Sequence, residues 1–158
     1  MNTLKKIYCR TFQTGLKIAL PFLPYRTPKV VGSVTALPEV IRRKNCSKVL
    51  IITDAGIRKL GLTVRLEKAL DRDGIPYCIY DKTVANPTTV NVSAAIDLYK
   101  TEGCDCIIGF GGGSSMDCAK AVGACLVKPK QTLANMKGIN KVNTQLTHIL
   151  AVPTPDGT

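Results

Sequence analysis

Apolar residues fall into short continuous runs that alternate with segments of helical periodicity. A run of four to six apolar residues without polar interruption is typical of a strand that is buried on both faces. The clearest example is Lys48 to Thr53, which reads Lys-Val-Leu-Ile-Ile-Thr. The runs predict strands over residues 29–33, 48–53, 75–80, 106–110 and 147–152.

Between these runs, apolar residues recur at the spacing of a helix face. Leu62, Leu66 and Leu70 share one face, and Gly74 follows as a helix-ending glycine, as Gly103 does for the next helix. Helices are predicted over 37–44, 62–73, 89–102 and 115–126, and a loop-rich segment over 128–145. Alternation of strands and helices predicts an α/β fold, Rossmann-like, with a mainly parallel sheet flanked by helices.

Residues 1–27 differ from this body, which we place at 28–158. Apolar side chains recur every four residues from Leu4 to Leu20 with lysines between them, and Pro21 and Pro24 follow. This pattern predicts a basic amphipathic helical arm. We favour docking of the arm on the body or on another subunit, and the alternative is contact of residues 1–20 with a membrane surface.

The formal net charge of +11 is concentrated at the two ends of the chain, whereas residues 39–117 are nearly neutral. Basic patches suit nucleic acid, but aromatic residues are not interleaved with them and no nucleic-acid-binding module is recognisable, so we expect no nucleic-acid partner. No apolar run reaches the roughly 20 residues that span a bilayer, and no secretory cleavage site follows the first one. We therefore expect a cytoplasmic protein.

Cysteine is frequent, with seven residues, but the chain has a single histidine, His148. Cys104 and Cys106 are separated by one residue instead of the two found in zinc or redox pairs. The sequence therefore predicts reduced structural thiols and no metal site.

The most informative local feature is the turn Gly111 to Ser114, which lies between the strand at 106–110 and a helix. Successive glycines let backbone N–H groups approach an anion, and the start of a helix favours phosphate. We interpret it as a nucleotide-phosphate loop in which Ser114 caps the helix; the alternative is a tight strand–helix connection. The dinucleotide fingerprint Gly-x-Gly-x-x-Gly fails here, because Ser114 stands at its third glycine.

Polar residues follow several predicted strands, and in a parallel sheet these strand ends meet at one rim. Asp54 follows the strand at 48–53, Asp81 the strand at 75–80, and Thr154 the last strand. A carboxylate such as Asp54 can accept hydrogen bonds from both hydroxyls of an adenosine ribose and would repel a 2′-phosphate. The alternative for Asp54 is an Asx turn or a helix cap ahead of Gly56.

Four segments together resemble the iron-containing (group III) alcohol dehydrogenase family, which is related to glycerol dehydrogenase and dehydroquinate synthase. The resemblance covers about residues 28–158. The segments are Ile52-Thr53-Asp54, Ala85-Asn86-Pro87-Thr88, Gly111 to Asp117 with Ala119-Lys120-Ala121, and Val152-Pro153-Thr154.

The resemblance implies NAD as the cofactor, with the glycine turn on its pyrophosphate and Asp54 on its ribose. Asn86 and Thr154 would line the cleft, although an Asn-Pro pair such as Asn86-Pro87 is also a common turn starter. Lys120 is expected to be a solvated helix residue. The implied cofactor-binding residues are Asp54, Asn86, Gly112, Gly113, Ser114, Asp117, Thr154 and Thr158. The chain departs from the family after Thr154, where Pro155 and Asp156 replace a threonine and an alanine.

The resemblance also implies metal-assisted hydride transfer between an alcohol or aldehyde and NAD, with Fe²⁺ or another divalent ion held by a C-terminal helical domain. That domain and its ligands are not in this sequence, so we expect no catalytic residues here and an inactive chain. A homodimer is implied only by analogy. The alternatives are a nucleotide-binding module without catalysis and a fragment of a glycerol dehydrogenase-like enzyme.

Overall fold

A computed structural model describes residue 14, residues 30–129 and residues 147–154. The chain divides into two units, residues 1–30 and residues 31–158. The arm predicted at 1–27 lies outside the described residues, apart from residue 14. The four strands and the helices between them lie in the second unit.

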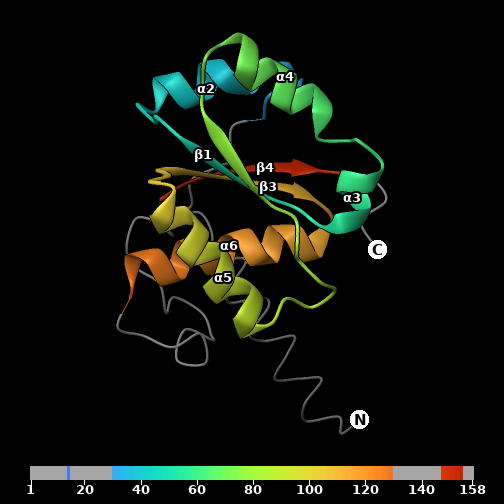
Figure 1. Cartoon of the computed structure of the whole chain (residues 1–158), viewed down its shortest axis with the longest axis vertical. Helices are drawn as coiled ribbons and strands as arrows, with labels where there is room; N and C mark the ends of the chain where they lie inside the picture. Colours follow the sequence, from blue (N-terminus) through green and yellow to red (C-terminus); the bar gives the residue numbers. More distant parts are fainter. Residues whose placement is uncertain (1–13, 15–29, 130–146, 155–158) are drawn as a thin grey trace, which may run out of the picture. The chain divides into compact units, whose positions relative to one another are not determined.

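Four strands form one sheet in which every neighbouring pair is parallel. The order across the sheet is β2-β1-β3-β4, so the chain builds outward from β1 in both directions. The strands are β1 (Val49–Ile52), β2 (Tyr77–Tyr80), β3 (Cys106–Gly111) and β4 (His148–Pro153). Because every strand runs the same way, all carboxyl ends lie at one edge, next to α3 in Figure 1.

Helices cover both faces of the sheet (Figure 1), with α2 and α4 on one face and α5 and α6 on the other. The elements are a 3₁₀ turn η2 (Val34–Ala36) and the helices α2 (Leu37–Arg43), α3 (Ala55–Lys59), α4 (Val64–Arg72), α5 (Thr89–Thr101) and α6 (Gly113–Val127). Gly74 and Gly103 adopt positive φ angles after α4 and α5, which confirms them as the glycines that end these helices.

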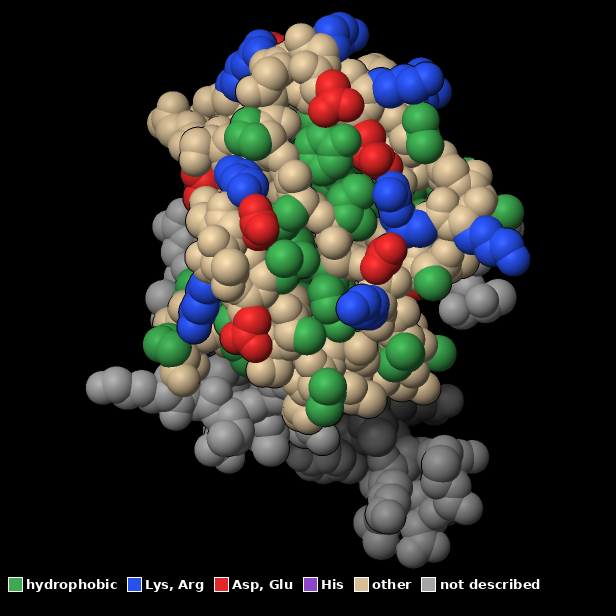
Figure 2. Space-filling model, in the orientation of Figure 1, with side chains coloured by type: hydrophobic (Ala, Val, Ile, Leu, Met, Phe, Trp, Pro, Cys, Tyr) green, Lys and Arg blue, Asp and Glu red, His purple; other side chains and the backbone are tan. Residues whose placement is uncertain are grey.

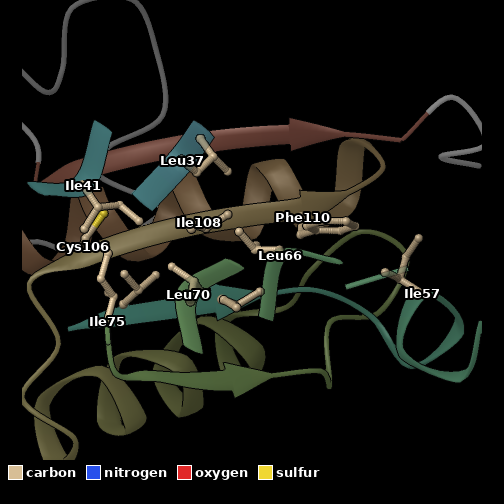
Figure 3. Packing of buried hydrophobic residues seen from close by; sticks show 11 residues of the cluster. Leu37, Ile41, Ile57, Leu66, Leu70, Ile75, Cys106, Ile108 and Phe110 are labelled. Atoms are coloured by element: carbon tan, nitrogen blue, oxygen red, sulfur yellow. The ribbon is translucent and has the colours of Figure 1, made fainter. Parts of the chain in front are cut away.

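The central strands β1 and β3 are buried along their whole length. Successive side chains alternate between two apolar clusters. Ile51 and Ile108 pack toward α2 and α4, as Figure 3 shows for Ile108 among the residues of that cluster. Leu50 and Ile107 pack toward α5 and α6 on the other face. Burial on both faces explains why these strands are continuous apolar runs without polar alternation.

The four main strands and the four main helices lie where the sequence predicts them, with ends shifted by one or two residues. The predicted strand at 29–33 is wrong, because residues 30–33 form no strand and the Val30 side chain is 93% exposed. The short helix α3 was not expected. Within the described segments, no helix is long and apolar enough to cross a membrane.

Candidate functional site

The polar residues that follow the strands do meet at one rim. Thr53 N donates to Tyr80 O at 2.8 Å, which carries the β1–β2 ladder to the strand ends. Thr154 N donates to Gly111 O at 3.0 Å, which fixes the end of β4 to the glycine turn. Because β1 also pairs with β3, the turns after β1, β2 and β3 lie side by side.

A cavity of about 430 Å³ lies between these three turns. This volume is within the range of ligand pockets. Apolar side chains and a few polar groups share its wall, which is typical of a small-molecule site. Its lining residues are Asp54, Ala55, Gly56, Ile57, Leu60, Thr83, Val84, Ala85, Gly112, Ser114 and Ser115.

Asp54 has a structural role as well as a place in the cavity wall. Its Oδ1 accepts a hydrogen bond from Ile57 N at 2.9 Å and caps α3. Its Oδ2 is turned toward the glycine turn, where Ser115 Oγ lies 3.5 Å away. The helix-cap interpretation of Asp54 is therefore confirmed. One carboxylate oxygen remains with only a long hydrogen bond beside the cavity.

The glycine turn is shaped by Gly111, whose φ of +132° is rarely adopted by residues with a side chain. A Cβ at Gly111 would lie 2.9 Å from Ser115 Oγ and 3.4 Å from Asp54 Oδ2. A side chain would therefore push into the contact between Ser115 and Asp54. The close approach of the two turns depends on a glycine at this position.

Helix α6 begins two residues earlier than expected, at Gly113. Gly112 is its N-cap, no side chain caps it, and Ser114 already lies inside the helix. The prediction that Ser114 caps this helix is therefore wrong. The reason is that the helix starts at Gly113, so the N-cap position falls on Gly112. Glycine has no side chain, and the first N–H groups of α6 are therefore left without a side-chain acceptor. These N–H groups lie at the wall of the cavity, because Gly112 and Ser114 both line it.

Other predicted site residues lie near the rim but outside the cavity wall. Asn86 is exposed and adopts a φ of +57°, one residue after Ala85 of the wall. Gly113 is exposed at the start of α6. Asp117 is also exposed and forms an ion pair with Lys120 at 3.3 Å, consistent with a solvated Lys120.

Thr154 lies at the end of β4, and its Oγ1 is buried without a hydrogen-bond partner in the described structure. Thr53 Oγ1, at the end of β1, is in the same state. Thr83 Oγ1, in the cavity wall, also lacks a partner among the described residues, whereas Thr53 and Thr154 do not line the cavity. A buried hydroxyl without a partner costs about 1–3 kcal/mol, so Thr83 favours a polar ligand in the cavity. Thr158 lies outside the described residues, as do Pro155 and Asp156.

Two hydroxyl-bearing cavity residues were missed by the sequence analysis. Ser115 is 1% exposed and links α6 to Asp54, and Thr83 lies in the turn after β2. For Ser115 a signal was available, because it extends the glycine-serine motif by one residue. Thr83 carries no comparable signal, since it lies three residues beyond β2 and its place depends on the path of that turn.

The charge of the cavity limits what it can bind. Among its described lining residues, Asp54 alone carries a charge. A phosphate here would be held by the N–H groups of α6 and by hydroxyls, without a lysine or arginine. The carboxylate of Asp54 suits a diol. The wall therefore offers N–H donors for an anion at the start of α6 and a carboxylate acceptor at Asp54.

The described residues do not fit an iron site. Within these ranges, no three His, Cys, Asp or Glu side chains lie close enough together to hold a metal ion.

The fold and the cavity define a parallel α/β protein of the nucleotide-binding type. A family model for iron-containing alcohol dehydrogenase matches residues 28–158. The chain belongs to this family.

Known relatives agree with this assignment. Lactaldehyde reductase of Escherichia coli (strain K12) is 33% identical over 128 residues, covering 80% of this chain and 34% of the relative. NAD-dependent methanol dehydrogenase of Bacillus methanolicus is 29% identical over 137 residues, covering 87% of this chain and 36% of the relative. The crystal structure of NADH-dependent butanol dehydrogenase A from Thermotoga maritima matches with a TM-score of 0.72 and 26% identity, covering 84% and 34%. The chain thus spans about a third of the length of these relatives.

Proposed function

We propose that this chain provides the NAD-binding part of an alcohol dehydrogenase, which transfers hydride between an alcohol or aldehyde and the nicotinamide. The observation that carries the proposal is the cavity between the uncapped start of α6 and the Asp54 carboxylate. Support also comes from two relatives whose names state NAD or NADH dependence. The alcohol or aldehyde substrate follows from the relatives' names, and a homodimer stays a prediction.

The residues have separate tasks in this proposal. The N–H groups at Gly112, Gly113 and Ser114 bind the pyrophosphate, because they start a fifteen-residue helix without a side-chain cap. Asp54 Oδ2 accepts from the ribose hydroxyls, while Oδ1 stays on the backbone of α3. When bound, NAD supplies a ring that accepts or returns a hydride.

Asn86, Asp117 and Thr154 have secondary tasks. Asn86 has a left-handed backbone conformation in the turn after β2, directly after Ala85 of the cavity wall. Thr154 offers a buried hydroxyl that has no partner among the described residues. Asp117 is one turn into α6 on its exposed side, where it would meet only a part of the cofactor that extends beyond the cavity.

Calorimetric titration with NAD, NADP and ADP-ribose tests the proposal, with Asp54→Asn as the variant. Asparagine is also a good helix cap, so α3 should be retained while the charge is removed. A charge-assisted hydrogen bond contributes about 1.5–3 kcal/mol, so NAD should bind roughly 10- to 100-fold more weakly to the variant. Preference over NADP should shrink, because the repulsion of a 2′-phosphate is lost.

Asp97→Asn is the matched control, since Asp97 is an exposed carboxylate on α5 and does not line the cavity. It should bind all three ligands as the wild type does. If the wild type binds neither NAD nor ADP-ribose, the nucleotide site is refuted. If it binds both, the nucleotide site is supported, and a binding module without catalysis stays the alternative to the dehydrogenase.

A further inference from the structure

Two thiols meet at the end of the sheet opposite the cavity. Cys78 Sγ and Cys104 Sγ are 3.3 Å apart, and both cysteines are free. Cys78 is the second residue of β2, and Cys104 lies between the end of α5 and the start of β3. The contact therefore bridges the edge strand β2 and the α5–β3 junction across the amino end of β1.

The two thiols differ in exposure. Cys78 is partly exposed, whereas Cys104 is 7% exposed. In Figure 2, hydrophobic side chains gather along the middle of the visible face, in the region of β2, with charged side chains around them. β2 is an edge strand with partly exposed side chains, so a small reagent in solution can reach Cys78 before Cys104.

Two charged side chains near the pair shift the pKa values of the thiols in opposite directions. Burial raises the pKa of both thiols, that of Cys104 to about 12. The Glu102 carboxylate also raises both pKa values, while the Lys48 ammonium lowers them. Lys48 and Glu102 pair with each other at 2.7 Å. At neutral pH both thiols are therefore mostly protonated, and the pair is stable until it meets an oxidant.

We propose that Cys78 and Cys104 form a modification site that closes to an intramolecular disulfide by exchange with a low-molecular-weight disulfide such as oxidised glutathione. The bridge fastens β2 to the α5–β3 junction. It is independent of the nucleotide cavity, because it lies at the other end of the sheet.

The reaction takes two exchange steps. The Cys78 thiolate attacks one sulfur of oxidised glutathione, which forms a mixed disulfide and releases one glutathione thiolate. The Cys104 thiolate then attacks Cys78 Sγ, which forms the Cys78–Cys104 bond and releases the second glutathione thiolate. The two protons lost by the cysteines pass to the two released thiolates. The protein loses two electrons, and oxidised glutathione becomes two molecules of glutathione.

Peptide mapping of the full chain after incubation with oxidised glutathione tests the proposal. Blocking the remaining thiols and digesting with trypsin separates residues 73–82, which contain Cys78, from residues 101–120, which contain Cys104, Cys106 and Cys118. We expect a linked pair of these peptides with the bond at Cys104, the loss of two free thiols, and reversal by dithiothreitol. Because both pKa values lie above neutral, the rate should rise about tenfold per pH unit near neutrality.

Variants separate a pair from two unrelated thiols. Cys104→Ser should accumulate a glutathione adduct on Cys78, because no second thiol resolves it, and Cys78→Ser should give no linked peptide. Cys125→Ser is the matched control, a partly buried thiol on α6 whose loss should leave the link unchanged. In the wild type, an adduct on Cys78 that persists, or a link from Cys78 to Cys106 or Cys118, would overturn the proposal.

Discussion

Replacing Gly111 with alanine tests the geometry that brings the glycine turn against Asp54. An alanine at a φ of +132° costs about 1–3 kcal/mol in backbone strain. Its Cβ would lie 2.9 Å from Ser115 Oγ, so the hydroxyl must move away from Asp54, at about 1 kcal/mol for the weakened hydrogen bond. We expect Gly111→Ala to lower the free energy of unfolding by about 2–4 kcal/mol.

Urea unfolding followed by far-UV circular dichroism measures this loss. With a slope of about 2 kcal/mol per molar urea, the midpoint should fall by roughly 1–2 M. Gly113→Ala is the control, two residues further on, because a Cβ there meets no atom within 4 Å and its φ is not positive. Alanine also favours a helix over glycine by up to about 1 kcal/mol, so Gly113→Ala should be neutral or slightly stabilising.

The pair of variants also separates folding from binding. Gly113→Ala should keep the fold. It should weaken the binding of NAD if the N–H group of residue 113 contacts the pyrophosphate closely. The explanation of the turn is refuted if Gly111→Ala unfolds at the same urea concentration as the wild type, or if both variants lose the same stability.

Two further substitutions remove side-chain hydrogen bonds to the backbone, one before β1 and one at the start of α5. Asp105 accepts from Ser47 N and Ser47 Oγ, each at 2.7 Å, and from Lys48 N at 3.0 Å, so Asp105→Ala should cost about 1–3 kcal/mol in urea unfolding. Burial would raise the pKa of Asp105, but these hydrogen bonds lower it overall. The stabilisation by Asp105 is therefore fully present above the unfolded pKa of about 3.9 and is lost as the pH falls through the lower folded pKa. A difference in unfolding free energy between variant and wild type that stays constant into acid would contradict this. Thr88→Ala removes one half of the capping box with Asn91 at the start of α5 and should cost about 1 kcal/mol, whereas an unchanged melting temperature would show that the cap contributes nothing.

The strands and long helices could be predicted because their signals are local. The run Val49–Ile52 is apolar throughout, and the structure buries it on both faces. The residues around Val30 have similar composition but form no strand, because composition alone does not supply a neighbouring strand to pair with. Helix α3 is only five residues long with one buried side chain, Ile57, so it has no periodicity to detect.

The site was predicted in part for the same reason. Asp54, Gly112 and Ser114 were identified from motifs, and the structure places all three at one cavity. The helix cap at Asp54 was one of the alternatives that the sequence offered, and the structure confirms it. That Gly112 rather than Ser114 is the N-cap of α6 depends on backbone angles that composition does not determine. Ser115 itself could have been identified from the glycine-serine motif, but its contact with Asp54 spans 61 positions of the chain, and no local pattern reveals that contact.

The cavity wall is drawn from residues 54–60, 83–85 and 112–115, three segments that adjoin only when the parallel sheet is complete. No one of these segments can form the wall alone. Occupancy of the cavity and folding of the sheet are therefore a single linked equilibrium. A ligand at 100 times its dissociation constant would add about 2.7 kcal/mol to the folded state. Amides deep in β1 that exchange only when the whole sheet unfolds would then exchange with solvent more slowly by the full factor, although they lie far from any ligand atom.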